Sequence, residues 1–268
     1  MVVAKVGGTV LKGGLAPDLA HDIKHVLSDN RVVLVHGGGI EVTEIASRLG
    51  KEQRFIVSPT GFRSRYTDRE TAQIYTMVMA GMVNKQIVSI LQRNGVPAVG
   101  LSGLDGLLIQ AERKKRLIVV DERGRRRAID GGYTGRIVAV NAPLLRLLIE
   151  EGYTPVVAPV AISGEFEPLN VDGDRTAAYV AGALKADRLV LLTDVGGVTL
   201  NGELVPKLSV AEVKEVLPKI GPGMITKVYA ATEALGMGVG EVVIASGFER
   251  SPISSSLKHG FGTVITNE

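Results

Sequence analysis

Short apolar runs that end in glycine, each followed by a segment with helical periodicity, constrain the fold of this chain more than any other feature. Arg31 to His36 form a β-branched run that breaks into three glycines, and Glu41 to Leu49 then have the apolar spacing of a helix. Such alternation is typical of a mainly parallel sheet covered by helices on both faces, so we expect an α/β fold. Later units of the same kind are Thr154 to Ala158, Asp174 to Ala183, Arg188 to Leu192, Ser209 to Leu217 and Glu241 to Ile244.

Three further segments complete the expected organisation. The spacing predicts a long helix from Thr71 to Arg93, and Leu108 to Ile129 has the pattern of a β-hairpin with its turn at Glu122 to Gly124. Pro159 to Pro168 is rich in Gly, Pro and Ser, which marks it as the best candidate for a boundary. We therefore expect an N-terminal lobe of residues 1–165 and a C-terminal lobe of residues 166–268.

The composition limits the kinds of site that the chain can build. Its 268 residues are 45% apolar, enough to bury a sizeable core, and the absence of cysteine excludes disulfides, thiolate metal ligands and cysteine nucleophiles. His21 and His25 share a helix face without an obvious third ligand, so we expect no metal site made of protein ligands. The chain opens on a strand-like segment and has no uninterrupted apolar run long enough to span a bilayer. We expect a cytoplasmic protein without a membrane segment.

Positive charge is concentrated in one segment, Arg113 to Arg127. Eight basic residues against two acidic ones give this segment a net charge of +6, which leaves −3 for the rest of a chain whose net charge is +3. The segment could be a solvated hairpin or a docking surface for a polyanion. Nucleic acid is a poor fit, because no aromatic residues lie between the charges to stack on bases. The basic residues are Arg113, Lys114, Lys115, Arg116, Arg123, Arg125, Arg126 and Arg127.

Four short motifs, far apart in the sequence, each supply a cation or exposed backbone amides. In Lys5 to Gly8 a lysine at a strand end precedes two glycines, and His36 to Gly39 is a glycine-rich turn before a helix. Glycine lets amide N–H groups approach an anion closely, and ligands of open α/β sheets bind at the carboxyl ends of the strands. The other two motifs are Asn170 to Asp174 and Gly223 to Lys227. Together they indicate a phosphoryl group held between two lysines.

Rival interpretations of the glycine motifs lack the residues that they require. An HGGG segment also forms the oxyanion hole of some esterases, but Gly100 to Leu104 lacks the last glycine of their G-x-S-x-G elbow. No segment matches a Walker loop, and Gly236 to Glu241 lacks the last glycine of a dinucleotide fingerprint. The chain therefore has the features of a kinase without a P-loop.

In this order the motifs resemble those of the amino acid kinase family, and within it the acetylglutamate kinase branch. The match spans essentially the whole chain and includes G-x-R at Gly61 to Arg63 and T-D-V-x-G-V at Thr193 to Val198, besides the four motifs above. The resemblance implies a three-layer αβα sandwich, the amino acid kinase fold, whose N-terminal lobe binds the acyl acceptor and whose C-terminal lobe binds ATP.

The resemblance also implies a role for individual residues. Lys5 and Lys227 would stabilise the transferring phosphoryl group, and Asp174 would hold both lysines in place. Magnesium would be carried mainly by the nucleotide phosphates. The acceptor would be bound by Gly38, Gly39, Arg63, Arg65 and Asn170, with either arginine able to hold its carboxylate. The nucleotide would be surrounded by Gly7, Gly8, Thr193, Asp194, Gly196, Gly197, Gly223, Met224 and Thr226.

One departure from the common pattern of this branch bears on the substrate. Where acetylglutamate kinases usually have G-L-R-V-T, Gly61 to Thr67 is two residues longer and holds a second arginine. This form resembles kinases whose acceptor, aminoadipate or glutamate, is attached through its amino group to the small acidic carrier protein LysW. Their product is an acyl phosphate on the side-chain carboxylate, in lysine and arginine synthesis. The basic segment Arg113 to Arg127 would then dock the carrier.

Two other functions stay open at this point. An ordinary N-acetylglutamate kinase of arginine synthesis would have most of the same motifs, and a catalytically silent nucleotide-binding regulatory protein could share the fold. Because the chain lacks the N-terminal helical extension of hexameric relatives, the resemblance implies a homodimer.

Overall fold

The computed structural model describes the backbone of residues 1–268 and every side chain except that of Pro222. Its main sheet has the strand order β16-β18-β17-β13-β1-β2-β10-β5. Neighbouring strands are parallel except β17 and β18, which confirms the expected mainly parallel sheet. In this order the strands are Lys207–Ser209, Thr263–Thr266, Glu241–Ser246, Arg188–Thr193, Val2–Val6, Val32–His36, Thr154–Val157 and Ala98–Leu101.

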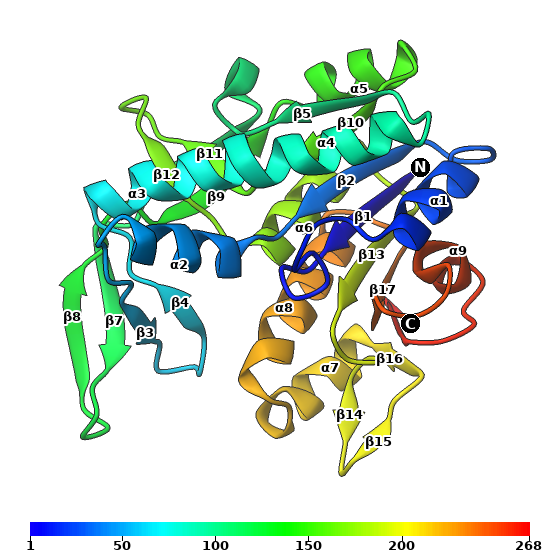
Figure 1. Ribbon diagram of the computed structural model, residues 1–268. Coiled ribbons are helices and arrows are strands. Elements are labelled where there is room, and N and C mark those ends of the chain that lie inside the picture. Colours follow the sequence, from blue (N-terminus) through cyan, green and yellow to red (C-terminus); the bar gives the residue numbers. More distant parts are fainter.

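Helices cover both faces of this sheet, so the predicted three-layer αβα architecture is confirmed (Figure 1). Alternate residues of one strand point to opposite layers, as strand geometry requires: Val3 packs in one core cluster, whereas Val2 and Ala4 pack in the other. The first layer contains α5 (Ala142–Glu150), α6 (Gly173–Leu184), α7 (Val210–Val216) and α8 (Pro222–Gly236). The second contains α1 (Pro17–Val26), α2 (Gly39–Arg48), α3 (Arg69–Thr76), α4 (Asn84–Arg93) and α9 (Pro252–Leu257).

The long helix expected from Thr71 to Arg93 is present as one continuous element. It consists of α3, the π-helix η1 (Met77–Val83) and α4, and the Asp68 side chain caps its first turn by accepting from the Thr71 N–H at 2.8 Å. Although the sequence has no uninterrupted apolar run of that length, this helix is long and apolar enough to cross a membrane by length and composition. One face of the helix packs against the sheet, in the same core cluster as α1 and α2, and this buries many of its apolar side chains.

Smaller sheets and hairpins surround the main sheet. A four-stranded sheet has the order β12-β11-β6-β9, and β3–β4, β7–β8 and β14–β15 are two-stranded. The predicted hairpin is confirmed as β7–β8, whereas Ile109–Arg113 at its expected start belongs to β6 and pairs with β9. The bounds are β3 Phe55–Val57, β4 Arg63–Arg65, β6 Ile109–Arg113, β7 Arg116–Val120, β8 Arg126–Asp130, β9 Gly135–Val140, β11 Val160–Ile162, β12 Pro168–Asn170, β14 Thr199–Leu200 and β15 Glu203–Leu204. The 3-10 segments are η2 Asp105–Leu107 and η3 Leu217–Lys219.

The segment Pro159 to Pro168 differs from a simple linker. Val160–Ile162 is a buried strand that pairs with β12, and only the residues between these two strands form the turn that the Gly-rich composition indicates. A boundary at residues 165 and 166 falls in this turn. The division into two lobes stays a prediction.

Candidate active site

The carboxyl ends of three adjacent strands, β13, β1 and β2, bring the glycine motifs together. Lys5 lies opposite Leu191 on one neighbouring strand and Val35 on the other, one residue before β1 ends. The turns that follow β1 and β2 approach so closely that a Cβ on Gly37 would lie 2.5 Å from the Gly8 nitrogen. Only glycine fits there, which explains why both motifs lack side chains at this point.

A buried carboxylate holds the two predicted lysines side by side. Asp174 on α6 pairs with Lys5 Nζ on β1 at 2.7 Å and with Lys227 Nζ on α8 at 3.0 Å. The three side chains are 6%, 8% and 13% exposed, respectively. Burial alone would raise the pKa of Asp174, but the two ammonium groups outweigh it and lower the pKa to about 2. Two cations and one anion leave a net positive charge at this point.

Two cavities meet at Lys5 and Gly8. The larger, of about 660 Å³, is lined by predicted acceptor residues, and the smaller, of about 450 Å³, by predicted nucleotide residues. Both include Lys5 and Gly8 in their lining. Around the larger cavity are Gly38, Gly39, Arg63, Arg65, Asn170 and Asp174. Around the smaller are Gly7, Thr193, Asp194, Gly197, Gly223, Met224 and Lys227.

Two residues expected near the nucleotide lie elsewhere. Thr226 lines the larger cavity, and Gly196 is outside the lining of both cavities, next to Gly197. A helical turn explains the first difference: Met224 faces the smaller cavity, and Thr226, two residues further along α8, points in another direction.

The two arginines of β4 have different environments. Arg65 is buried, and its guanidinium donates to the Gly39 carbonyl at 2.8 Å, to Thr43 Oγ1 at 3.0 Å and to the Gln53 side chain. Arg63 is exposed in the cavity wall, with its guanidinium 4.2 Å from the Phe55 ring centroid. Arg65 therefore has its hydrogen bonds directed to the protein, whereas the Arg63 fork can reach a carboxylate.

The basic segment forms part of the rim of the larger cavity. Hairpin β7–β8 lies beside hairpin β3–β4 at one end of the molecule, and its Leu117, Ile118 and Val119 line the cavity (Figure 1). At its tip, Asp121 pairs with Arg125 at 3.2 Å and with Arg127 at 2.9 Å. The other charged residues of the hairpin are exposed: Arg116, Glu122, Arg123, Arg126 and Asp130.

Lys114 differs from the other basic residues of this segment. It is half-buried and lines the larger cavity itself, where burial first and then the nearby Arg175 lower its pKa. The sequence grouped it with the docking residues because it lies among them in the chain. Its position at the junction of β6 and β7 turns it into the cavity instead.

Some residues of the cavity gave no signal in the sequence. Phe62 and Tyr229 both line the cavity and meet edge to face, with ring centroids 5.2 Å apart, and so join the β3–β4 hairpin to α8. Arg175 donates through Nε to Glu233 at 2.7 Å, which ties α6 to α8. Each pair is far apart in the sequence, so no spacing rule could connect its members.

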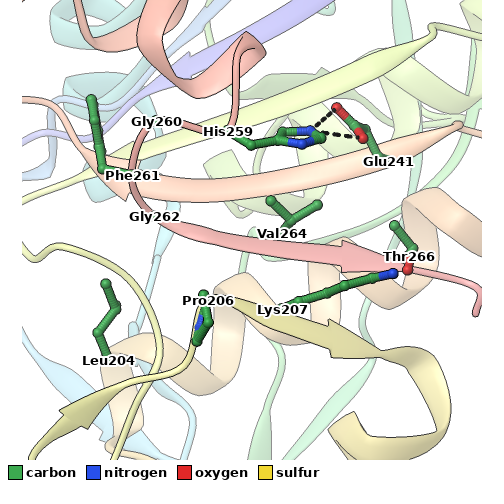
Figure 2. A pocket seen from close by; sticks show the side chains of 10 residues that line it. All are labelled: Leu204, Pro206, Lys207, Glu241, His259, Gly260, Phe261, Gly262, Val264 and Thr266. Atoms are coloured by element: carbon green, nitrogen blue, oxygen red, sulfur yellow. Dashed lines mark hydrogen bonds and ion pairs between the residues drawn. The ribbon is translucent and has the colours of Figure 1, made fainter.

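Among the side chains that the structure describes, no group of three His, Cys, Asp or Glu residues could hold a metal ion. A further cavity of about 630 Å³ lies beside the edge strand β16 and its neighbour β18, where His259 Nε2 is 2.9 Å from the Glu241 carboxylate (Figure 2). None of the predicted site residues lines it.

Comparison with known proteins shows to which protein family a chain with this fold and these motifs belongs. The family model described as "Amino acid kinase family" matches residues 1–246. The chain belongs to the amino acid kinase family. The resemblance inferred from the motifs is confirmed over nearly the whole length of the chain.

Two full-length relatives of this chain carry the same name. A LysW-aminoadipate/LysW-glutamate kinase of Metallosphaera sedula is 46% identical over 267 residues, which cover 99% of this chain and 100% of that protein. A Nitrosopumilus maritimus protein, provisionally given the same name, is 53% identical over 268 residues and all of both chains. Among solved structures, smu.665 from Streptococcus mutans has a TM-score of 0.81 at 26% identity and covers 100% of this chain and 98% of that one.

Proposed function

We propose that this chain transfers the γ-phosphoryl group of ATP to the side-chain carboxylate of aminoadipate or glutamate that is linked through its amino group to the carrier protein LysW. The products are ADP and an acyl phosphate in lysine and arginine synthesis. The observation that carries the reaction is the junction of two cavities at Lys5, beside the Lys5–Asp174–Lys227 cluster. The full-length likeness to proteins of that name supports the acceptor.

The smaller cavity fits a nucleoside triphosphate. Its wall combines the glycines of the β1 turn with Thr193 and Asp194 at the end of β13 and with Lys227 from α8. Backbone amides and lysine ammonium groups are the usual partners of phosphate oxygens. Magnesium, bound to the nucleotide phosphates, would neutralise part of their charge.

The transfer itself needs position and charge. An oxygen of the acceptor carboxylate attacks the γ-phosphorus while the bond from this phosphorus to the β–γ bridging oxygen breaks, and ADP leaves with that oxygen. A carboxylate is ionised at neutral pH, so the chain needs no general base. Lys5 and Lys227 neutralise charge on the non-bridging oxygens of the moving group, and Asp174 fixes both ammonium groups before the reaction.

The larger cavity holds the acceptor in this proposal. Arg63 binds its α-carboxylate, and Asn170 binds the acylated nitrogen with the side-chain oxygen that remains after its Nδ2 donates to Thr67 Oγ1 at 2.9 Å. The amides of Gly38 and Gly39 face the reacting end. Lys114 supplies a further cation in the same cavity.

Hairpin β7–β8 docks the carrier in this proposal. It borders the cavity that takes the acceptor, and its charge is complementary to an acidic protein, which raises the association rate. We also propose, on the resemblance alone, that the protein is a cytoplasmic homodimer with an acceptor lobe and an ATP lobe. A hexamer in light scattering would contradict the dimer.

The acceptor is tested by trapping the acyl phosphate with hydroxylamine. Purified protein with ATP and magnesium is given N-acetylglutamate, LysW-linked aminoadipate or LysW-linked glutamate, and hydroxamate is measured. We expect product from the linked forms only. Product from free N-acetylglutamate would instead support an N-acetylglutamate kinase, and no product from any acceptor, with ATP still bound, would support a silent nucleotide-binding protein.

The docking role is tested by removing charge at the tip of the hairpin. Replacing Arg125, Arg126 and Arg127 with Ser should raise the KM for the linked acceptor at least about tenfold at low salt, with a smaller effect at high salt, and leave the KM for ATP unchanged. A matched control replaces the exposed Arg31, Arg48 and Arg93 with Ser, which makes the same change in net charge away from the cavity. Equal effects in both triple variants would refute docking.

A further inference from the structure

His36 is a fully buried histidine that the proposed reaction does not use. It ends β2, immediately before the glycine turn, and its side chain contacts Asn84, which is also fully buried. Asn84 begins α4, directly after the π-helix. A histidine and an amide buried together must satisfy each other's hydrogen bonds, so their pairing shows which ring nitrogen carries the proton.

The partners of Asn84 fix the orientation of its amide. Its Nδ2 lies 2.9 Å from the Val156 carbonyl and 3.1 Å from His36 Nε2, while its Oδ1 accepts from Lys85 Nζ at 3.1 Å. Because a carbonyl can only accept and an ammonium can only donate, the NH₂ group must face Val156 and His36. His36 Nε2 therefore accepts, and the ring proton is on Nδ1.

The Nδ1–H of His36 is then placed to hold the glycine turn. Nδ1 lies 2.8 Å from the Gly37 carbonyl oxygen and donates to it. Burial, the largest cause, lowers the pKa of His36 to about 4, with Lys85 on α4 and Lys5 on β1 acting in the same direction against this hydrogen bond. The ring is thus neutral at physiological pH.

A fixed Gly37 carbonyl also fixes the amide on the other side of the same peptide. In a trans peptide the C=O and the next N–H point in opposite directions, so the Gly38 N–H is turned away from His36. The Gly38 nitrogen lies 3.1 Å from the point where a Cβ of Gly8 would be, and Gly8 lines both cavities. Within the residues that the structure describes, this N–H has no acceptor.

The surroundings of Asn84 are shaped to keep it in place. A Cβ on Gly100 would lie 1.9 Å from Asn84 Oδ1, so the side chain occupies space that only a glycine leaves open. Lys85 Nζ also donates to the Gly100 carbonyl at 2.9 Å, which closes the network at its outer end.

We propose that Asn84 and His36 are positioning residues that direct the Gly38 amide N–H toward the anionic group at the junction of the two cavities. Asn84 sets the tautomer of His36, His36 holds the Gly37 carbonyl, and the peptide presents its N–H to the moving phosphoryl group or the acceptor carboxylate. The identity of the anion, phosphoryl group or acceptor carboxylate, rests on the proposed function. The tautomer of His36 does not depend on it.

The decisive variant is Asn84→Asp, which keeps the shape and replaces the donor beside Nε2 with an acceptor. At low pH the carboxyl introduced at position 84 and His36 Nε2 share one proton, and the His36 Nδ1–H still donates to the Gly37 carbonyl. When that proton leaves as pH rises, the carboxylate favours the Nε2–H tautomer, and the Nδ1 lone pair then faces the Gly37 oxygen. We expect kcat to fall about 100-fold as pH rises through the pKa of the pair, the loss typical of one anion-binding donor, with the KM for ATP little changed. Asn84→Ala should be slow at every pH.

The second measurement is ¹⁵N NMR of the four histidines in the full-length protein. Wild-type His36 should show a protonated Nδ1 and an unprotonated Nε2 that do not titrate between pH 6 and 8. In Asn84→Asp the protonated nitrogen should change to Nε2 at high pH.

A wild-type His36 protonated at Nε2, or an Asn84→Asp rate that parallels wild type or Asn84→Ala at all pH values, would overturn the proposal. Failure of the wild-type protein to phosphorylate any acceptor would refute the proposed function and leave the NMR result to decide the tautomer.

Discussion

Replacing Asp174 with Asn should destabilise the protein strongly, because this carboxylate compensates two buried ammonium groups. Lys5 and Lys227 are 8% and 13% exposed on the side chain, so water cannot take over the role of the carboxylate. Removing one partner of a buried ion pair costs about 3–5 kcal/mol, and we expect Asp174→Asn to lower the free energy of unfolding by that amount at pH 7. Asparagine keeps the shape and one acceptor, so the loss reports on charge.

Urea denaturation of four proteins tests this reasoning. They are wild type, Asp174→Asn, Lys227→Met and the double variant. Because the double variant no longer buries a second uncompensated lysine, it should lose about 1–3 kcal/mol less than the sum of the single losses. An Asp174→Asn loss below about 1 kcal/mol, or losses that simply add, would refute the claim that the three side chains act as one charged unit.

The sign of the pH dependence follows from the same cluster. The pKa of Asp174 in the folded protein, about 2, is below its ordinary value of 3.8. The stabilisation from this group is therefore complete above the ordinary value and is lost as pH falls toward 2. Asp174→Asn should lack this part of the acid destabilisation.

Three other predictions concern single side chains. Arg63→Ala should raise the KM for the acceptor about tenfold or more and change the free energy of unfolding by no more than about 0.5 kcal/mol. Arg65→Ala should lower the free energy of unfolding by more than about 2 kcal/mol, because buried acceptors lose their donor. Equal stabilities of the two variants in urea denaturation would contradict this. Lys114→Met should raise the KM for the acceptor but not for ATP, and the exposed Lys115→Met should change neither in steady-state assays. Since burial lowers the pKa of His36 from 6.5 to about 4, unfolding free energy should fall by about 3 kcal/mol as pH decreases through this window, and a His36→Gln protein without that fall would confirm the source.

Local sequence predicted the features that depend on backbone geometry. The run that ends at His36 and the glycines that follow it define a strand, a turn and a helix start within eight residues, and the structure has each of them. Parallel strands then bring the Lys5 turn beside this one, because the carboxyl ends of such strands share an edge. The αβα fold could be predicted for this reason.

Features that depend on side-chain direction or distant contact could not be predicted. Arg63 and Arg65 are the same residue type two positions apart on β4, and only the burial of Arg65 against Gly39 and Gln53 separates their environments. In the sequence Lys114 is part of a charge run, but the bend between β6 and β7 directs it into the cavity. Asn84 carries no motif.

In the proposed function, the transferring phosphoryl group lies between the ammonium groups of Lys5 and Lys227. The most direct test is the single-turnover rate of acyl phosphate formation on the LysW-linked acceptor for wild type, Lys5→Met and Lys227→Met, with the Kd for ATP measured on each protein. We predict that each variant lowers the rate by about 100- to 1,000-fold while the Kd for ATP changes by about tenfold or less, because both cations act mainly in the transition state. A variant that keeps the wild-type rate, or loses activity only through weaker ATP binding, would contradict the claim.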